Sequence, residues 1–225
     1  MPFLQRGELT LHYRIAGSGE KLLFIPGTMS DLRGSESIFS TPLVEHFEIL
    51  SFDPRGIGQS NSPDEEVTMK TYSDDVKWLL DALGWQRCNC LGESFGGMVA
   101  QQVVLDHSKY FIKLALAATS SGGKGGASYP FHQHDLSAMS LDKRVAFWIE
   151  KCDLRAQDPL WQQHEPVLYH QQYDYYKESM QYAGENPDYK INSQRQIHAR
   201  KGHNTFERLY QLTLPTYDAK IWHGL

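Results

Sequence analysis

The order of apolar and polar positions predicts alternating strands and helices over the first 120 residues. Residues 2–16 alternate on both sides of a turn at Gly7, which predicts a β-hairpin whose polar face, including His12, points outward. Continuous apolar runs are typical of strands buried on both faces of a sheet, and they follow at residues 22–25, 47–53, 88–91 and 112–118. Strands in this order, with helices between them, predict an α/β fold with a mostly parallel sheet.

Three helices are predicted between these strands. Apolar residues at helical spacing predict the first over residues 35–47, interrupted by Pro42. The second begins with Ser73 as its N-cap and ends at Gly84, with leucine and valine side chains on its inward face. The third, over residues 97–107, is small and apolar on one side, as expected of a helix packed closely against a sheet.

A run rich in glycine and serine at residues 120–126 marks an internal boundary. Beyond it, strand-like patterns give way to a segment rich in tyrosine, glutamine, histidine and tryptophan. We therefore predict a core over residues 1–120, a helical cap over 121–212 and an incomplete return to the core over 213–225. Helices within the cap are expected at residues 142–150, 166–182 and 192–198.

Composition and charge exclude several classes of protein. The 225 residues are 40% hydrophobic and 22% charged, which is ordinary for a soluble globular domain. The net charge of −5, without any basic block, argues against nucleic acid or an anionic membrane as a partner. No targeting segment is recognised and no apolar run approaches the roughly 20 residues of a membrane helix, so a cytoplasmic location is expected. The three cysteines are predicted to be reduced thiols.

Residues 88–101 read as a short strand, a serine between two glycines and the start of a helix. This is the Gly-x-Ser-x-Gly pattern of a nucleophile elbow, with Ser94 at its tip. A strand that turns into a helix within a few residues crowds the backbone, and Gly92 and Gly96 remove two Cβ atoms from the turn. The helix that starts near Phe95 directs free N–H groups and its positive dipole end to the same place, where an oxyanion could bind.

Other glycine- and histidine-containing motifs do not predict a cofactor or a metal. The loop Asp53–Ser60 is not a dinucleotide-binding fingerprint, because the third glycine position is Asn61 and no helix is predicted there. Residues 122–126 lack the Gly-Lys-Ser/Thr end of a phosphate loop. His132 and His134, next to an aspartate, have a spacing found in metal sites, but no second ligand cluster accompanies them. We therefore expect no bound cofactor and no metal.

Together these motifs resemble the α/β-hydrolase family, in particular its capped esterase, lactonase and proline-iminopeptidase-like members. Phe24–Thr28 is similar to the family's strand ending in His-Gly-x, and Phe52–Ser60 looks like its Asp-x-Arg-Gly-x-Gly-x-Ser motif. The elbow at Gly92–Gly96 follows in the family's order and at roughly its spacing. The resemblance covers about residues 1–120 and implies an α/β-hydrolase fold with an inserted helical cap.

The resemblance also implies roles for residues of the elbow and of the loop after the first apolar run, residues 22–25. Ser94 is implied to be a nucleophile that attacks a carbonyl and forms an acyl-enzyme. The backbone N–H groups of Phe95 and Thr28, or of Met29 if the loop is shifted, are implied to form the oxyanion hole. Pro26 replaces the family's frequent histidine, which does not supply the oxyanion N–H, so the oxyanion hole is still expected.

Asp53 and Arg55 are implied to brace the loop beneath the site rather than to act in catalysis. Serine instead of a carboxylate at position 94 argues against haloalkane dehalogenase or epoxide hydrolase chemistry, for which members of the family use a carboxylate nucleophile. The expected substrate is a small acyl compound, namely a carboxylic ester, a lactone or a related acyl derivative.

One part of the family's pattern is missing from this sequence. A serine nucleophile needs an acid and a histidine, which follow the serine after later strands of this fold. The sequence instead offers Asp218 and His223, and we do not expect this pair to form a working acid and base. His198 and His203, near the end of the predicted cap, are expected to have surface or hinge roles.

We hypothesise that the coding sequence was interrupted, with residues 218–225 as an out-of-frame tail. The C-terminal strand or strands and the last helix of the fold would then be missing. This predicts an uncovered sheet edge and reduced solubility, unless a neighbouring chain covers that edge in an oligomer. Two rival hypotheses to a serine hydrolase follow: a non-catalytic chain that keeps the pocket, and a binding or receptor protein of this fold.

Overall fold

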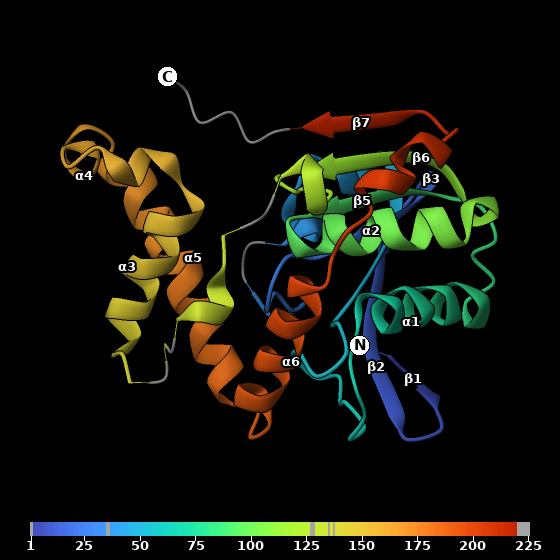
Figure 1. Ribbon diagram of the computed structural model, residues 1–225, viewed down its shortest axis with the longest axis horizontal. Helices are drawn as coiled ribbons and strands as arrows, with labels where there is room; N and C mark the ends of the chain where they lie inside the picture. The colour runs from blue at the N-terminus through green and yellow to red at the C-terminus, as the bar shows by residue number, and fades with distance from the viewer. Residues whose placement is uncertain (1, 35–36, 127–128, 135, 137, 220–225) are drawn as a thin grey trace.

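A seven-stranded sheet forms the centre of the protein, with the strand order β1-β2-β4-β3-β5-β6-β7. The computed structural model describes residues 2–34, 37–126, 129–134, 136 and 138–219 (Figure 1). β2 runs antiparallel to β1 and β4, and every other neighbouring pair is parallel, which confirms the prediction of an α/β fold with a mostly parallel sheet. In chain order the strands are β1 (Phe3–Arg6), β2 (Leu9–Gly17), β3 (Glu20–Ile25), β4 (Phe47–Phe52), β5 (Cys88–Glu93), β6 (Phe111–Ala117) and β7 (Thr216–Ala219).

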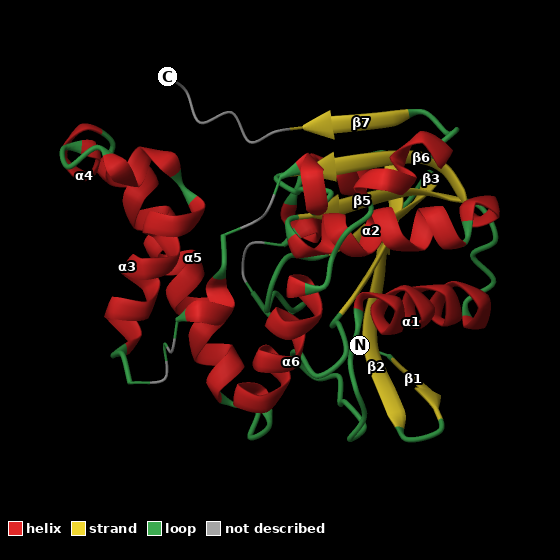
Figure 2. Ribbon diagram, in the orientation of Figure 1, coloured by secondary structure: helices red, strands yellow, loops and turns green. Residues whose placement is uncertain are grey.

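Two helices, α1 (Met69–Ala82) and α2 (Phe95–Asp106), pack against each other and against the sheet (Figure 2). Their buried side chains join those of the central strands in one hydrophobic core, to which Leu23, Val76 and Val103 belong. Burial of this apolar surface is the main stabilising contribution to the fold. The core therefore fixes α2, and with it the turn between β5 and α2.

The start of α1 differs from the prediction. Thr68 is the N-cap, and the Thr68 and Thr71 hydroxyls each accept a hydrogen bond from the other residue's backbone N–H. The predicted N-cap at Ser73 is wrong, because Ser73 is fully buried inside the helix. The reciprocal hydrogen bonds of the two threonines satisfy N–H groups that a helix otherwise leaves unpaired at its start.

The chain between β6 and β7 forms a group of helices that we call the helical insertion, residues 121–212. It lies to one side of the sheet and has its own hydrophobic cluster around Val145, Ile149 and Trp161 (Figure 1). The two ends of the insertion meet at a bridge between Gly122 and Asn204. None of the helices in the described part of the chain is long and apolar enough to span a membrane. The helices of the insertion are α3 (Leu141–Cys152), α4 (Trp161–His164), α5 (Pro166–Gly184) and α6 (Tyr189–Lys201).

The helix predicted over residues 35–47 is replaced, in its described part, by two short 3-10 turns. These turns are Ile38–Ser40 and Pro42–Glu45. Between them Thr41 is extended, with ψ of 158°, because a proline disfavours α backbone in the residue before it. The segment therefore links β3 to β4 without an α-helix.

The hairpin of β1 and β2 is confirmed, but its polar face is not entirely exposed. His12 is only 1% exposed, because the loop after β4 covers it and Asp53 meets its ring. The prediction that His12 points outward is therefore wrong.

The chain returns to the sheet through β7, which pairs with β6 and places Asp218 opposite Leu116. Tyr217 and Asp218 are exposed on this edge strand. Asp218 thus lies within a strand, and His223, its proposed partner, lies outside the described residues.

Candidate active site

Ser94 occupies the tight turn between β5 and α2 with φ of 51° and ψ of −114°. A positive φ is uncommon for a residue with a side chain and carries a free-energy cost, so the surrounding structure must hold it in place. The Ser94 N–H donates to the Ala117 carbonyl at 2.8 Å. The Ser94 carbonyl accepts from the Gly97 N–H at 3.0 Å and from the Thr119 hydroxyl at 2.7 Å. The strained turn is therefore fixed from β6 as well as from α2.

Gly92 and Gly96 allow α2 to approach the strands closely. A Cβ atom on Gly92 would lie 2.7 Å from the Ala100 Cβ, and one on Gly96 would lie 2.0 Å from the Ile25 carbonyl oxygen. Neither glycine has a positive φ. Their role is to leave space for backbone contact, which positions the N-terminus of α2 beside the end of β3.

The loop after β3 lies directly beside Ser94. A Cβ atom on Gly27 would be 3.6 Å from the Ser94 Cβ, so the backbone here is in near contact with the serine. The N–H groups of Thr28 and Phe95 make no hydrogen bond with any other described residue. Phe95 is the first residue of α2, where the N–H is unpaired and the helix dipole is positive. Two unpaired backbone donors therefore flank the serine.

Met29, the alternative donor considered from the sequence, is already engaged. Its N–H donates to the Gln196 Oε1 at 2.7 Å, and its backbone has φ of 59°. The Tyr189 hydroxyl lies 3.0 Å from the Met29 sulfur. The helical insertion therefore occupies the Met29 N–H and leaves that of Thr28 unpaired.

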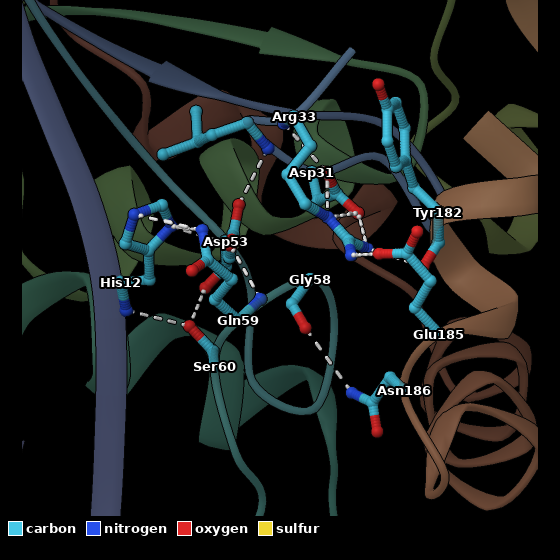
Figure 3. Close-up of polar contacts among 11 residues, drawn as sticks. His12, Asp31, Arg33, Asp53, Gly58, Gln59, Ser60, Tyr182, Glu185 and Asn186 are labelled. Carbon is cyan, nitrogen blue, oxygen red and sulfur yellow. Dashed lines mark hydrogen bonds and ion pairs between the residues drawn. The ribbon is translucent and has the colours of Figure 1, made fainter. Parts of the chain in front are cut away.

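Asp53 is fully buried and connects three segments beneath the site (Figure 3). Its Oδ1 accepts from the Leu32 N–H at 2.7 Å, and its Oδ2 accepts from the Gln59 N–H at 2.8 Å. The same Oδ2 lies 2.8 Å from the His12 Nδ1. Asp53 therefore supports the loop after β3 and makes no hydrogen bond with Ser94.

Arg55 fixes the other side of the same loop. Its Nε and Nη2 donate to the two carboxylate oxygens of Asp75 on α1, both at 2.8 Å, and its Nη1 contacts Glu65. Burial disfavours the charged guanidinium, but the hydrogen bonds and negative charges of Asp75 and Glu65 together outweigh it and raise the pKa of Arg55. Arg55 thus attaches the loop to α1.

The helical insertion contributes two side chains to the site that the sequence did not reveal. Gln196 and Arg200, four residues apart on α6, bond to Met29 and Thr28 respectively. Their spacing on one face of a helix is the only sequence signal for this role. Farther out, Arg33 reaches from the loop to Asp31 and to the Tyr182 carbonyl of α5 (Figure 3).

Among the described residues no histidine and no carboxylate hydrogen-bonds with the Ser94 hydroxyl. His198 is exposed, and His203 is buried with its Nε2 3.1 Å from the Ser120 carbonyl. His134 stacks on Tyr129, while Asp135 lies outside the described residues. An open pocket of about 670 Å³ lies between the sheet and the segment that follows β3, where Leu32 and Ile38 line it together with Glu93 and Ala117, and Tyr175 of the insertion contributes to its wall.

The stability of the protein is expected to fall when His203 must be protonated. A carbonyl only accepts, so His203 Nε2 carries the proton and Nδ1 is a buried acceptor without a described partner. Burial lowers the pKa of His203 below its ordinary value of 6.5. The unfolded chain therefore binds a proton first as the pH falls below that value, and the free energy of unfolding decreases by up to about 1.4 kcal/mol per pH unit.

Urea unfolding of the native protein and of His203→Gln at several pH values between 5 and 8 measures this effect. We expect the variant to lose the part of the pH dependence that begins near 6.5. If the free energy of unfolding depends on pH identically in the two proteins, this expectation is wrong.

Comparisons with known proteins identify the fold. A family model described as alpha/beta hydrolase fold matches residues 21–200. The chain belongs to the alpha/beta hydrolase fold family. The expected α/β-hydrolase fold is thereby confirmed. Of the solved structures, the enol-lactonase from Burkholderia xenovorans LB400 is similar with a TM-score of 0.71 and 21% identity, over 96% of this chain and 80% of that one.

Curated relatives in this family match a shorter part of the chain. The soluble epoxide hydrolase of Corynebacterium sp. (strain C12) is 29% identical over 121 residues, which is 53% of this chain and 42% of that protein. The poly(3-hydroxyalkanoate) depolymerase of Ectopseudomonas oleovorans is 33% identical over 84 residues, which is 37% of this chain and 30% of the relative. The matched segments thus span less than half the length of these two relatives.

Proposed function

We propose that this alpha/beta hydrolase family member is a serine hydrolase that cleaves a carboxylic ester, a lactone or a related acyl bond. The observation that carries the proposal is the strained backbone of Ser94 between the unpaired N–H groups of Thr28 and Phe95. A strained serine with unpaired backbone N–H groups in neighbouring segments is typical of a nucleophile beside an oxyanion hole. The helical insertion would act as a cap over the pocket beside Glu93 and Tyr175.

In the proposed reaction the Ser94 hydroxyl oxygen bonds to the acyl carbon and gives its proton to a base. The carbonyl oxygen becomes an oxyanion, and the two backbone N–H groups stabilise it by hydrogen bonds in a site of low dielectric constant. The bond to the leaving alcohol then breaks, and that alcohol takes up a proton. Water hydrolyses the acyl-Ser94 bond, which releases the acid and restores the serine.

The names of two similar proteins support acyl chemistry. One is a depolymerase of poly(3-hydroxyalkanoate) and the other is an enol-lactonase. Another relative is an epoxide hydrolase, but a serine at position 94 favours acyl transfer over epoxide opening by a carboxylate nucleophile. We therefore favour esters and lactones as the substrate class.

The second candidate is a protein that keeps the pocket and the oxyanion site but does not turn over a substrate. The observation that favours it is the Ser94 hydroxyl itself, which has no hydrogen bond to a base or an acid in the described part of the chain. Without a base the serine remains a weak nucleophile at neutral pH. Ligand affinity without turnover is the expected behaviour of such a protein.

Labelling with an active-site-directed fluorophosphonate separates the two candidates. We expect the native protein to be labelled at Ser94, Ser94→Ala not to be labelled, and Ser108→Ala, which changes an exposed serine in the 3-10 turn after α2, to be labelled like the native protein. Peptide mass spectrometry identifies the modified residue. A folded native protein that is not labelled would favour the second candidate, and labelling retained in Ser94→Ala would contradict the assignment of the nucleophile.

A further inference from the structure

Arg200 extends from α6 toward the loop that carries Thr28. Its Nη1 donates a hydrogen bond to the Thr28 Oγ1 at 3.0 Å, and its guanidinium lies over the Phe131 ring, 5.0 Å from the centroid. Burial lowers the pKa of Arg200, while the nearby Cys152 thiol acts in the opposite direction. A positive charge removed from water in this way interacts more strongly with an anion than a surface charge does.

A cavity of about 200 Å³ opens beside this guanidinium. Arg200, Lys201 and His203 contribute basic side chains to its wall, and of the described residues that line it none carries a carboxylate. Met98 and Phe131 supply apolar surface. A water molecule occupies only about 30 Å³ of liquid, so the cavity has room for a short chain with one charged end.

We propose that this cavity binds the carboxylate of a small acyl substrate, with Arg200 as its principal ligand. The substrate would be a half-ester of a short dicarboxylic acid or a lactone that bears a carboxylate. The inference rests on the proposed function, because it requires Ser94 to attack the other carbonyl of the same molecule. It identifies Arg200 as a residue that determines specificity.

Thr28 links the cavity to the serine. Its hydroxyl contacts Arg200, and its unpaired N–H is one of the two oxyanion donors. Arg200 therefore joins the wall of the cavity to the residue whose N–H is a proposed oxyanion donor. A planar guanidinium also fixes the orientation of a carboxylate through parallel N–H donors, which a lysine ammonium does not do.

The test measures binding without turnover, in Ser94→Ala protein, by calorimetric titration with monomethyl succinate and with dimethyl succinate at pH 7. The two probes differ in one negative charge. We expect the monoanion to bind at least about tenfold more tightly, as a charge-assisted hydrogen bond provides. Adding Arg200→Gln should abolish the preference, and Arg200→Lys should retain only part of it.

Arg195→Gln is the matched control, because Arg195 lies on the same helix but pairs with Asp64 on the surface of the core. It should leave the preference for the monoanion unchanged. The inference would be overturned if the two probes bind with equal affinity or if the monoanion does not bind detectably. It would also be overturned if Arg200→Gln reduces the affinity for both probes equally. If Arg200→Gln fails to fold, as judged by circular dichroism, the inference is tested by two other measurements. These are the preference of Ser94→Ala for the monoanion and the reduction of that preference by Arg200→Lys. If Ser94→Ala binds the monoanion but the native protein is not labelled by a fluorophosphonate, the proposed hydrolase activity would be refuted while the carboxylate site would still be supported.

Discussion

Gly96→Ala is expected to lower the free energy of unfolding by about 3 kcal/mol or more. The new Cβ would lie 2.0 Å from the Ile25 carbonyl oxygen and 2.5 Å from that of Pro26. These are backbone atoms, so no rotation of a side chain relieves the overlap, and α2 must move away from the end of β3. Such a movement also separates the Phe95 N–H from the Thr28 N–H, so we expect fluorophosphonate labelling to decrease in the same variant.

Urea unfolding monitored by circular dichroism measures this change. Gly184→Ala is the matched control, because Gly184 is the last residue of α5 and an added Cβ there meets no atom within 4 Å. Its effect should be at most about 1 kcal/mol, in the stabilising direction, because alanine favours a helix more than glycine does. If Gly96→Ala unfolds at the same urea concentration as the native protein, the close approach of α2 to β3 is not a requirement of the fold.

Asp75→Asn is expected to destabilise the protein by about 3 kcal/mol or more. Asp75 and Arg55 are only 2% and 3% exposed in their side chains and share two hydrogen bonds of 2.8 Å. Asparagine leaves the Arg55 charge buried against a neutral amide, with Glu65 at the surface as its remaining carboxylate. Removing one partner of a buried pair is costly because the other charge remains out of water.

The neighbouring Asp74 provides the control. It pairs with Lys70 four residues earlier on the exposed face of α1, where the two side chains are 43% and 70% exposed. Asp74→Asn should therefore change the free energy of unfolding by no more than about 0.5 kcal/mol. Equal effects of the two substitutions in thermal or urea unfolding would show that the buried pair does not hold the loop of Arg55 to α1.

The sequence predicts the sheet well because buried strands need continuous apolar runs, and those at β3, β4, β5 and β6 are unmistakable. The elbow is also predictable, because its chemistry depends on residues within a few positions of Ser94. Two other predictions are wrong because a local backbone preference or hydrogen bond overrides the apolar pattern. Thr41 before Pro42 stops an α-helix that the apolar spacing alone would allow. Two threonines bond each other's backbone and start α1 before Ser73.

Long-range contacts are the part that the sequence does not reveal. The alternation of β2 assigns His12 to the outer face, but Asp53, 41 residues later, covers it. The contacts of Gln196 and Arg200 with the loop after β3 join residues 167 and 172 positions apart. The spacing of Gln196 and Arg200 places them on one face of α6, but it does not identify the loop residues that they contact. The turn at Ser94 is therefore predictable from neighbouring residues, whereas the contacts of α6 with the loop after β3 form only when the chain has folded.

The attachment of α6 to the loop after β3 also limits how this protein could be redesigned or could diverge. An insertion between two strands usually looks like an independent module that another segment of similar length could replace. Here Gln196 occupies the Met29 N–H and Arg200 bonds the Thr28 hydroxyl. A transplanted segment would therefore have to form hydrogen bonds with both the Met29 N–H and the Thr28 hydroxyl. Otherwise the loop beside Ser94 would adopt a different conformation. Exchanging the insertion to change the substrate would at the same time alter the proposed oxyanion site, so under this proposal a change in specificity also changes reactivity.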